Sequence, residues 1–124
     1  MSASVDVHAL AAELLQKASA VGTGRASQTL PHPVDGLRQT LIALSAGALL
    51  DEHESPGPAS LMVIRGRVRI EAGDESVDLG PHHIVPIPDR RHSLRAAEQA
   101  VVLLSVALPA RSPDAQNPRR NVGG

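Results

Sequence analysis

The sequence predicts an all-β domain, folded as a sandwich or a small barrel, with one short helix in front of it. From Arg25 onward the chain consists of short runs rich in Val, Ile and Leu, separated by Gly, Pro and Asp. This texture is typical of antiparallel strands joined by tight turns, and no helical period returns after Arg25. The length of 124 residues and the hydrophobic content of 42% suit one domain with one core.

The helix is expected over residues 5–20. Ser4 or Asp6 can accept hydrogen bonds from the backbone N–H groups of the first turn, and Gly22 and Gly24 end the helix. The apolar side chains that recur at helical spacing are Val7, Leu10, Leu14 and Ala18.

Nine short strands are expected after the helix, a number that fits a sandwich or a small barrel. Turn-forming residues separate them, for example at 31–36, 72–75, 80–83 and 88–91. The expected strands are Ser27–Leu30, Leu37–Ser45, Leu49–Glu54, Ser60–Arg65, Arg67–Glu71, Ser76–Leu79, Ile84–Ile87, His92–Ala96 and Ala100–Leu108.

The last expected strand contains VVLLSVAL, residues 101–108, which is apolar on both faces. A strand has this pattern when the core covers one face and another subunit or the helix covers the other. We therefore expect a homodimer. The chain beyond this strand has little to bury, so the expected division is a helix and linker at 1–24, a barrel at 25–110 and a flexible tail at 111–124.

Composition argues against several classes of partner and chemistry. The 12 Lys and Arg balance the 13 Asp and Glu, so charge does not favour a nucleic acid or an anionic membrane. The absence of Cys removes thiolate ligands and nucleophiles, and the absence of Phe, Tyr and Trp removes stacking surfaces for bases and flat cofactors. No apolar run approaches a membrane span and no signal peptide is recognisable. We expect a cytoplasmic protein without nucleic-acid or membrane partners.

The segment from Gly47 to Gly66 keeps the spacing of a known motif. Gly47 is followed after five residues by His53, and Gly66 closes the segment. This spacing and the order of strands resemble the cupins, whose first motif is Gly, five residues, His, one residue, His, three or four residues, Glu, six residues, Gly. The resemblance is to small single-domain cupins of the cupin-2 type. It implies a small β-barrel, the double-stranded jelly roll, over about residues 37–108.

Two metal ligands of the first motif are missing from this chain. Ser55 and Ala59 stand where the resemblance places the second His and the Glu. Residues 82–96 resemble the second motif, with Pro88 in place and His92 as its histidine, although the turn between them is one residue short. The resemblance therefore implies a cupin with degenerate metal-binding motifs.

A bound metal would need substitute ligands. Catalytic metal sites usually have three protein ligands, and His53 with His92 would supply two. Because residues two apart in a strand face the same way, Asp51 is expected to share the face of His53 and is the third candidate. His32 is another candidate nitrogen ligand. We expect either no cofactor or a weakly held divalent metal.

Two functions from different classes remain. The first is a non-catalytic cupin, a sensor or accessory subunit that holds a small, partly apolar molecule, either neutral or anionic. The second is a metal-dependent cupin enzyme, an oxygenase or isomerase by family analogy, that uses a substitute ligand. We favour the first function because the missing ligands are visible in the sequence, so the prediction leans away from an enzyme. The ligand-binding residues expected at the barrel mouth are His53, Ser55, His92, Arg38 and Gln39.

Overall fold

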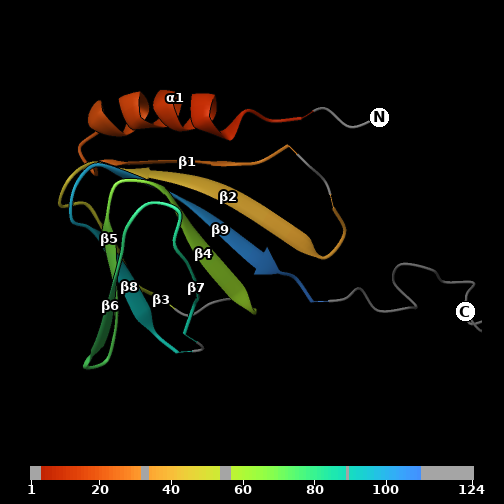
Figure 1. Ribbon diagram of the computed structural model, residues 1–124, viewed down its shortest axis with the longest axis vertical. Coiled ribbons are helices and arrows are strands. Elements are labelled where there is room, and N and C mark those ends of the chain that lie inside the picture. Colours follow the sequence, from red (N-terminus) through yellow and green to blue (C-terminus); the bar gives the residue numbers. More distant parts are fainter. Residues whose placement is uncertain (1–3, 32–33, 54–56, 89, 110–124) are drawn as a thin grey trace, which may run out of the picture.

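The computed structural model describes residues 4–31, 34–53, 57–88 and 90–109, with the side chains of residues 51–53 outside this description. Figure 1 shows one helix lying along one face of a set of strands. The helix α1 spans Val7–Ser19, and the strands are β1 (Arg25–Thr29), β2 (Leu37–Leu44), β3 (Leu49–His53), β4 (Ala59–Arg65), β5 (Val68–Ala72), β6 (Glu75–Leu79), β7 (Ile84–Pro86), β8 (His92–Ala96) and β9 (Ala100–Ala107). The expected tail at 111–124 lies outside the described residues.

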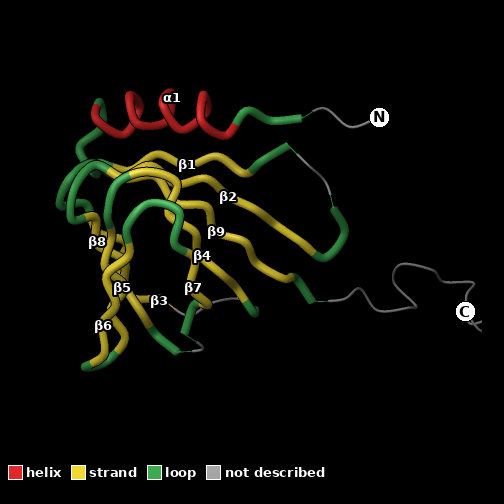
Figure 2. The backbone as a smooth tube through the Cα atoms, viewed as in Figure 1, coloured by secondary structure: helices red, strands yellow, loops and turns green. Residues whose placement is uncertain are grey.

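The strands form two antiparallel sheets that face each other (Figure 2). The five-stranded sheet has the order β1-β2-β9-β4-β7, and the four-stranded sheet has the order β3-β8-β5-β6. Every expected strand is present, and the bounds differ by one or two residues at most. The largest difference is at β1, which begins at Arg25 because that residue pairs with Leu44 in the ladder with β2.

The main core lies between the two sheets. It is built from alternate residues of the strands, such as Ile42 and Leu44 of β2, Val63 of β4 and Val102 of β9. These side chains are nine-tenths or more buried. The absence of aromatic residues leaves this core to Leu, Ile, Val and Ala, whose branched side chains suit a pleated surface.

A second core lies between α1 and the outer face of the five-stranded sheet. The helix begins after Asp6, whose Oδ1 accepts a hydrogen bond of 3.0 Å from the backbone N–H of Ala9. Its buried face packs against the residues of β2 and β9 that point away from the barrel, including Leu41 and Val101. The buried helix residues are Ala11, Leu14, Leu15 and Ala18.

This helix explains why the last strand is apolar on both faces. Val102 and Leu104 of β9 face the main core, whereas Val101 and Leu103 face α1. The sequence allowed either another subunit or the helix to cover the second face of β9, and over this part of the strand the helix covers it. Within the described residues, no helix is long and apolar enough to cross a membrane.

Candidate functional site

The candidate site begins where β3 and β8 pair. The Cα atoms of His53 and His92 are partners in this ladder, so the two histidines predicted from the motifs occupy facing positions on adjacent strands. The register shifts between Leu50 and His53, because Leu50 pairs with Leu94 while His53 pairs with His92. Three steps along β3 thus match two steps along β8, as in a β-bulge.

The irregularity in β3 bears on the expectation that Asp51 shares the face of His53. Simple alternation along the strand underlies that expectation, and alternation does not run unbroken through a bulge. Leu50 pairs with the core residue Leu94, and the Asp51 metal ligand stays a prediction. The side chains of Asp51 and His53 lie outside the described structure, as do Ser55 and His32 altogether.

His92 is buried, with 4% of its surface exposed, and it shares the inward face of β8 with Leu94 and Ala96. Its Nδ1 lies 2.8 Å from the carbonyl oxygen of Arg90. A carbonyl oxygen can only accept, so Nδ1 carries the proton in this bond. In the neutral ring Nε2 is then the acceptor atom, the form in which an imidazole can accept a hydrogen bond or bind a metal.

The His92 ring lines a small cavity between the sheets, of about 30 Å³. The other described residues that line it are all aliphatic: Ile42, Leu50, Leu61, Ile70, Ile87, Leu94 and Leu104. We call this space the interior cavity. Its lining offers hydrocarbon surface to a ligand and, among the described residues, one polar side chain that can fix orientation.

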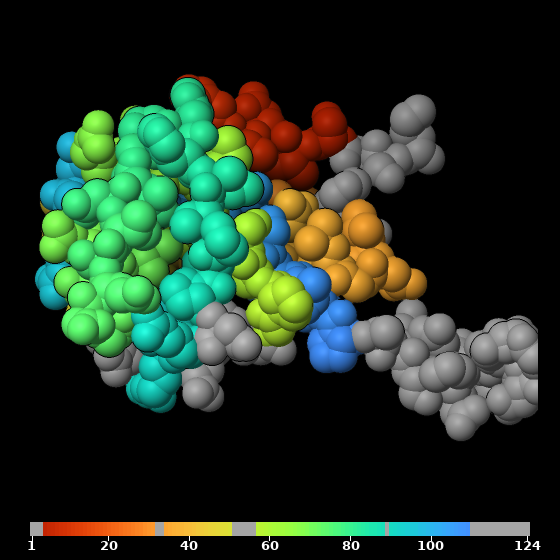
Figure 3. Space-filling model, turned by 60° about the horizontal axis from the view of Figure 1, so that its bottom comes forward, coloured from red at the N-terminus to blue at the C-terminus, as the bar shows by residue number. Residues whose placement is uncertain are grey.

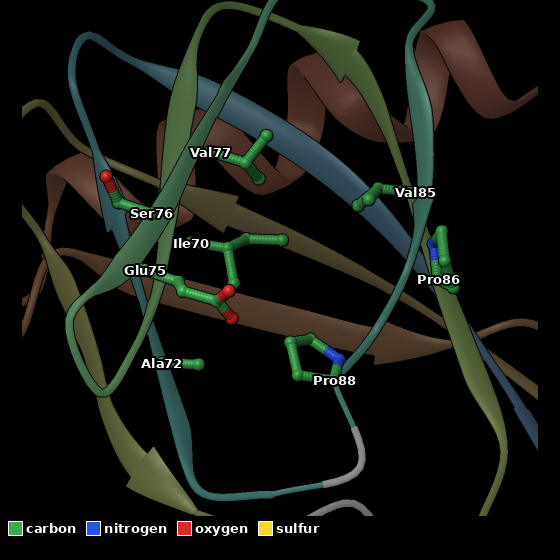
Figure 4. Close-up of a pocket in the computed structure, with 8 residues that line it drawn as sticks. All are labelled: Ile70, Ala72, Glu75, Ser76, Val77, Val85, Pro86 and Pro88. Carbon is green, nitrogen blue, oxygen red and sulfur yellow. The ribbon is translucent and has the colours of Figure 1, made fainter.

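A larger cleft opens between the hairpin β5–β6 and strand β7, with a volume of about 380 Å³. Figure 3 shows the face of the molecule on which these segments lie side by side, and Figure 4 shows the side chains that line the cleft. They are Ile70, Ala72, Glu75, Ser76, Val77, Val85, Pro86 and Pro88. This β6–β7 cleft shares Ile70 with the interior cavity, and Glu75 at its rim pairs with Arg90.

A second cleft lies at the opposite edges of the two sheets. Strands β1 and β2 form one side of it and β3 forms the other, and its volume is about 360 Å³. It is lined by Thr23, Arg25, Ala26, Ser27, Thr40, Ile42 and Leu50. This β1–β3 cleft shares Ile42 and Leu50 with the interior cavity. The interior cavity is therefore bordered by a cleft on each side.

The two remaining predicted ligand-binding residues lie on opposite faces of β2. Arg38 shares the barrel-facing side with Thr40 and Ile42, and its side chain is exposed. Gln39 has the parity of Leu41, which packs on α1, and its Nε2 donates to the Ser105 hydroxyl at 3.1 Å. The structure therefore brings Arg38, but not Gln39, to the side of the sheet that faces the barrel.

The described residues do not form a metal-binding group. No group of three His, Asp or Glu side chains suited to a metal ion occurs among the residues whose side chains are described, which excludes 51–53. Ala59 begins β4 at the glutamate position of the cupin motif, and its methyl side chain has no atom that can bind a metal. His82 and His83 are exposed in their turn, as the turn-forming residues around them predict.

The clearest charge interaction lies on the outer surface of the four-stranded sheet, away from the candidate site. Arg69 Nε and Nη2 donate to the Asp78 carboxylate at 2.8 and 3.1 Å, in a bidentate pair. This hydrogen bonding is the main cause that holds the pKa of Asp78 below its ordinary value of 3.8. The pair links β5 to β6 and belongs to the hairpin rather than to a site.

Sequence reasoning missed Arg25 and both clefts. The predicted barrel begins at residue 25 but its first strand begins at Ser27, so Arg25 stood before the strand and the direction of its side chain was not considered. The signal was present in RASQT, where Arg25, Ser27 and Thr29 alternate with Ala26 and Gln28. Extending the strand by two residues would have placed Arg25 on the same side as Ser27.

No protein-family model matches the sequence, and no curated protein matches it either. Solved structures do. A cupin superfamily protein from Desulfitobacterium hafniense is 20% identical with a TM-score of 0.63, over 68% of this chain and 78% of that one. The cupin-2 domain of an XRE-family transcriptional regulator from Enterobacter cloacae is 22% identical with a TM-score of 0.57, over 68% and 97%. Salicylate 1,2-dioxygenase from Pseudaminobacter salicylatoxidans is 17% identical with a TM-score of 0.70, over 80% of this chain and 33% of the dioxygenase.

These similarities and the two facing antiparallel sheets define the protein as one with the cupin fold. The fold class predicted from the sequence, a small all-β cupin barrel with a short N-terminal helix, is confirmed. The similar structures include a transcriptional regulator and an enzyme. Activity must therefore be argued from the site.

Proposed function

We propose that the protein is a non-catalytic cupin that binds a small, partly apolar molecule inside its barrel and acts as a sensor or accessory subunit. The observation that carries this proposal is the interior cavity, in which the described lining consists of seven aliphatic side chains and the buried His92. Hydrocarbon contacts would supply most of the binding free energy, and the imidazole would fix the orientation of one polar atom.

Two further observations support binding rather than catalysis. Ala59 occupies the place of the motif glutamate at the start of β4 and cannot ligate a metal. The cupin-2 domain of a transcriptional regulator has the same fold, which gives a sensing role a structural precedent. The ligand is expected to contact His92, with His53, Ser55 and Arg38 as the neighbouring candidates. Gln39 is the weakest candidate because of its position on the opposite face of β2.

The alternative is a metal-dependent enzyme of the oxygenase or isomerase type. The facing positions of His53 and His92 favour it, as does the Nδ1 hydrogen bond of His92, because metal-binding imidazoles commonly donate their other N–H to a carbonyl. Asp51 or His32 would have to complete the ligand set. A weakly held divalent ion there would polarise a substrate oxygen, and His92 would serve by holding its ring in one orientation.

Metal analysis of untagged protein separates the two functions. Under the binding proposal, the parent and a His53→Ala, His92→Ala variant should carry the same trace of metal. Such traces would come from the exposed pair His82–His83, which can bind nickel or zinc adventitiously. Near-stoichiometric metal in the parent that disappears in the variant would instead establish the enzyme alternative. Circular dichroism of both proteins checks that the variant is folded.

The partner and location expected from the sequence belong to this proposal as well. We place the protein in the cytoplasm, as a homodimer with a small-molecule ligand and without nucleic-acid or membrane partners. The balance of acidic and basic residues supports the exclusion of polyanionic partners.

A further inference from the structure

We propose that the ligand of the barrel is an aliphatic monocarboxylate, whose carboxylate binds to Arg25 in the β1–β3 cleft while its hydrocarbon chain extends into the interior cavity. This inference rests on the proposed function, because it requires the interior cavity to accept a ligand. It adds the chemical class of that ligand and the side of the barrel from which it binds.

The register of β1 places Arg25 toward the barrel. In the ladder with β2, Arg25 pairs with Leu44 and Ser27 pairs with Ile42. Leu44 and Ile42 both belong to the main core between the sheets. Paired residues of an antiparallel ladder face the same side, so Arg25 and Ser27 lie on the inner face of the five-stranded sheet, at its β1 edge.

The β1–β3 cleft has the chemistry of a carboxylate site. Arg25 is half-buried, and its Nη1 donates to the carbonyl oxygen of Leu49 at 3.3 Å, which ties the guanidinium to the edge of the opposite sheet. A guanidinium has five N–H donors in a planar fork that matches a carboxylate, and the bond to Leu49 uses one of them. Three residues with hydroxyl groups, Thr23, Ser27 and Thr40, line the same cleft.

The cleft also borders hydrocarbon. Ile42 and Leu50 line both the β1–β3 cleft and the interior cavity. A ligand with its carboxylate at Arg25 would place its hydrocarbon chain against these two side chains, at the boundary of the interior cavity. A carboxylate would be costly inside the cavity, where the described lining has His92 as its one polar side chain. The head group therefore stays in the cleft. The interior volume of about 30 Å³ favours a short chain.

The β6–β7 cleft is the less suitable side for an acid. Its ionisable side chain is Glu75, an acid already paired with Arg90. A second carboxylate there would be repelled by Glu75 unless that pair broke. Binding from the β1–β3 side meets Arg25 instead.

The test is a nuclear magnetic resonance titration of the full chain with butanoate, and with 1-butanol as the matched alcohol without charge. Methyl signals of Leu50, Leu94 and Leu104 report on the interior cavity, and backbone signals of β1 report on the cleft. Butanoate is expected to shift both sets and to bind more tightly than 1-butanol. Arg25→Gln should weaken butanoate by about tenfold or more, as expected for a lost charge-assisted hydrogen bond. It should change the dissociation constant of 1-butanol by less than about twofold.

Two control variants keep the test specific. Arg25→Lys keeps the positive charge but lacks the planar guanidinium, so its affinity for butanoate should lie between those of the parent and Arg25→Gln. Arg95→Gln removes an exposed arginine on β8 and should leave butanoate binding unchanged. The amide spectrum of each variant checks that its fold is retained.

The outcomes separate this inference from the proposed function. Equal binding of butanoate and 1-butanol to the cavity, with no effect of Arg25→Gln, would overturn the carboxylate site and leave the proposed function standing. Shifts confined to β1, without any at the interior methyl groups, would also overturn the inference. If neither compound shifts the signals of the interior methyl groups, both the proposed ligand binding in the cavity and the carboxylate inference fail.

Discussion

Gly47 and Gly66 bracket the first cupin motif, and both have positive φ angles, of +83° and +80°. They differ in what surrounds them. A Cβ on Gly47 would meet no atom within 4 Å, whereas a Cβ on Gly66 would collide with the carbonyl oxygen of Gln99 and lie 2.8 Å from Ala100 Cα. The backbone of β9 thus passes directly over Gly66. At Gly47 only the backbone conformation demands glycine.

Alanine substitutions should separate these two demands. Gly47→Ala should lower the free energy of unfolding by about 1–2 kcal/mol, the cost of a left-handed conformation for an L-residue. Gly66→Ala should cost more, on the order of 3 kcal/mol or above, because backbone atoms of the neighbouring strand must also shift. Urea denaturation measures both values. Gly22→Ala, where an added Cβ has open space and φ is not positive, is the control. Equal losses at Gly47 and Gly66 would contradict the role given to the β9 backbone.

His92 shows which features of a site residue can be predicted from the sequence. The strand pattern placed it at the start of a strand, and the resemblance to the cupin motif placed it at the barrel. In the structure it begins β8 and its side chain is buried on the inward face. Its hydrogen bond to the Arg90 carbonyl could not be foreseen, because that bond depends on the path of the turn before β8. Alternation along a strand determines on which face of the sheet a side chain lies, but not which group it hydrogen-bonds.

Among the elements, β3 limits what the sequence could predict about the candidate site. The strand itself was predicted almost to its bounds, yet the register shift between Leu50 and His53 was not. A bulge depends on how two strands meet, and residues 49–53 carry no glycine that would mark one. A single extra residue exchanges the faces of a strand. The metal set of Asp51, His53 and His92 rests on simple alternation through this irregular segment, and it stays a prediction.

The β5–β6 hairpin carries a pH-dependent contribution to stability. Because the Arg69 guanidinium lowers the pKa of Asp78 in the folded protein, this pair stabilises the fold above the ordinary value of 3.8. The contribution is lost as the pH falls through the lower pKa of the folded state. Its size is small, because both side chains are exposed to solvent.

Asp78→Asn should therefore flatten the acid side of the stability profile. Thermal unfolding midpoints measured between about pH 2 and 6 should fall less steeply in the variant than in the parent. Arg69→Gln should produce the same change, because it removes the other half of the pair. Curves for the parent and both variants that run parallel over this range would show that the pair contributes nothing measurable.

At the scale of the whole molecule, the two layers and the covering helix were predictable because their signals are periodic. Alternation in the strands and the spacing of Leu14 and Ala18 in the helix each mark a buried face. The clefts were not predictable, since each forms where edge strands from different sheets approach. Arg25 of β1 and Leu49 of β3 are 24 positions apart in the chain and meet only after folding.

The homodimer remains a prediction. The outer face of β9 was the reason to expect a homodimer, but it packs against α1 at Val101 and Leu103. A dimer would therefore have to use another surface. Exposed apolar side chains near the start of β2 are available, namely Val34, Leu37 and Leu108. Light scattering at several concentrations should give the mass of two chains, and Leu37→Glu should reduce it. Ile84→Glu, on the β7 edge, is the control. A single-chain mass at every concentration would rule the dimer out.

The interior cavity borders a cleft on each side, through Ile42 and Leu50 at one and Ile70 at the other. Side chains at two separate places therefore form the boundary of the interior cavity, one toward each pair of sheet edges. A bulky substitution at one of these places leaves the other as it is. Blocking a single cleft is therefore not a sufficient test of whether the cavity is used, and only variants at both places taken together isolate it.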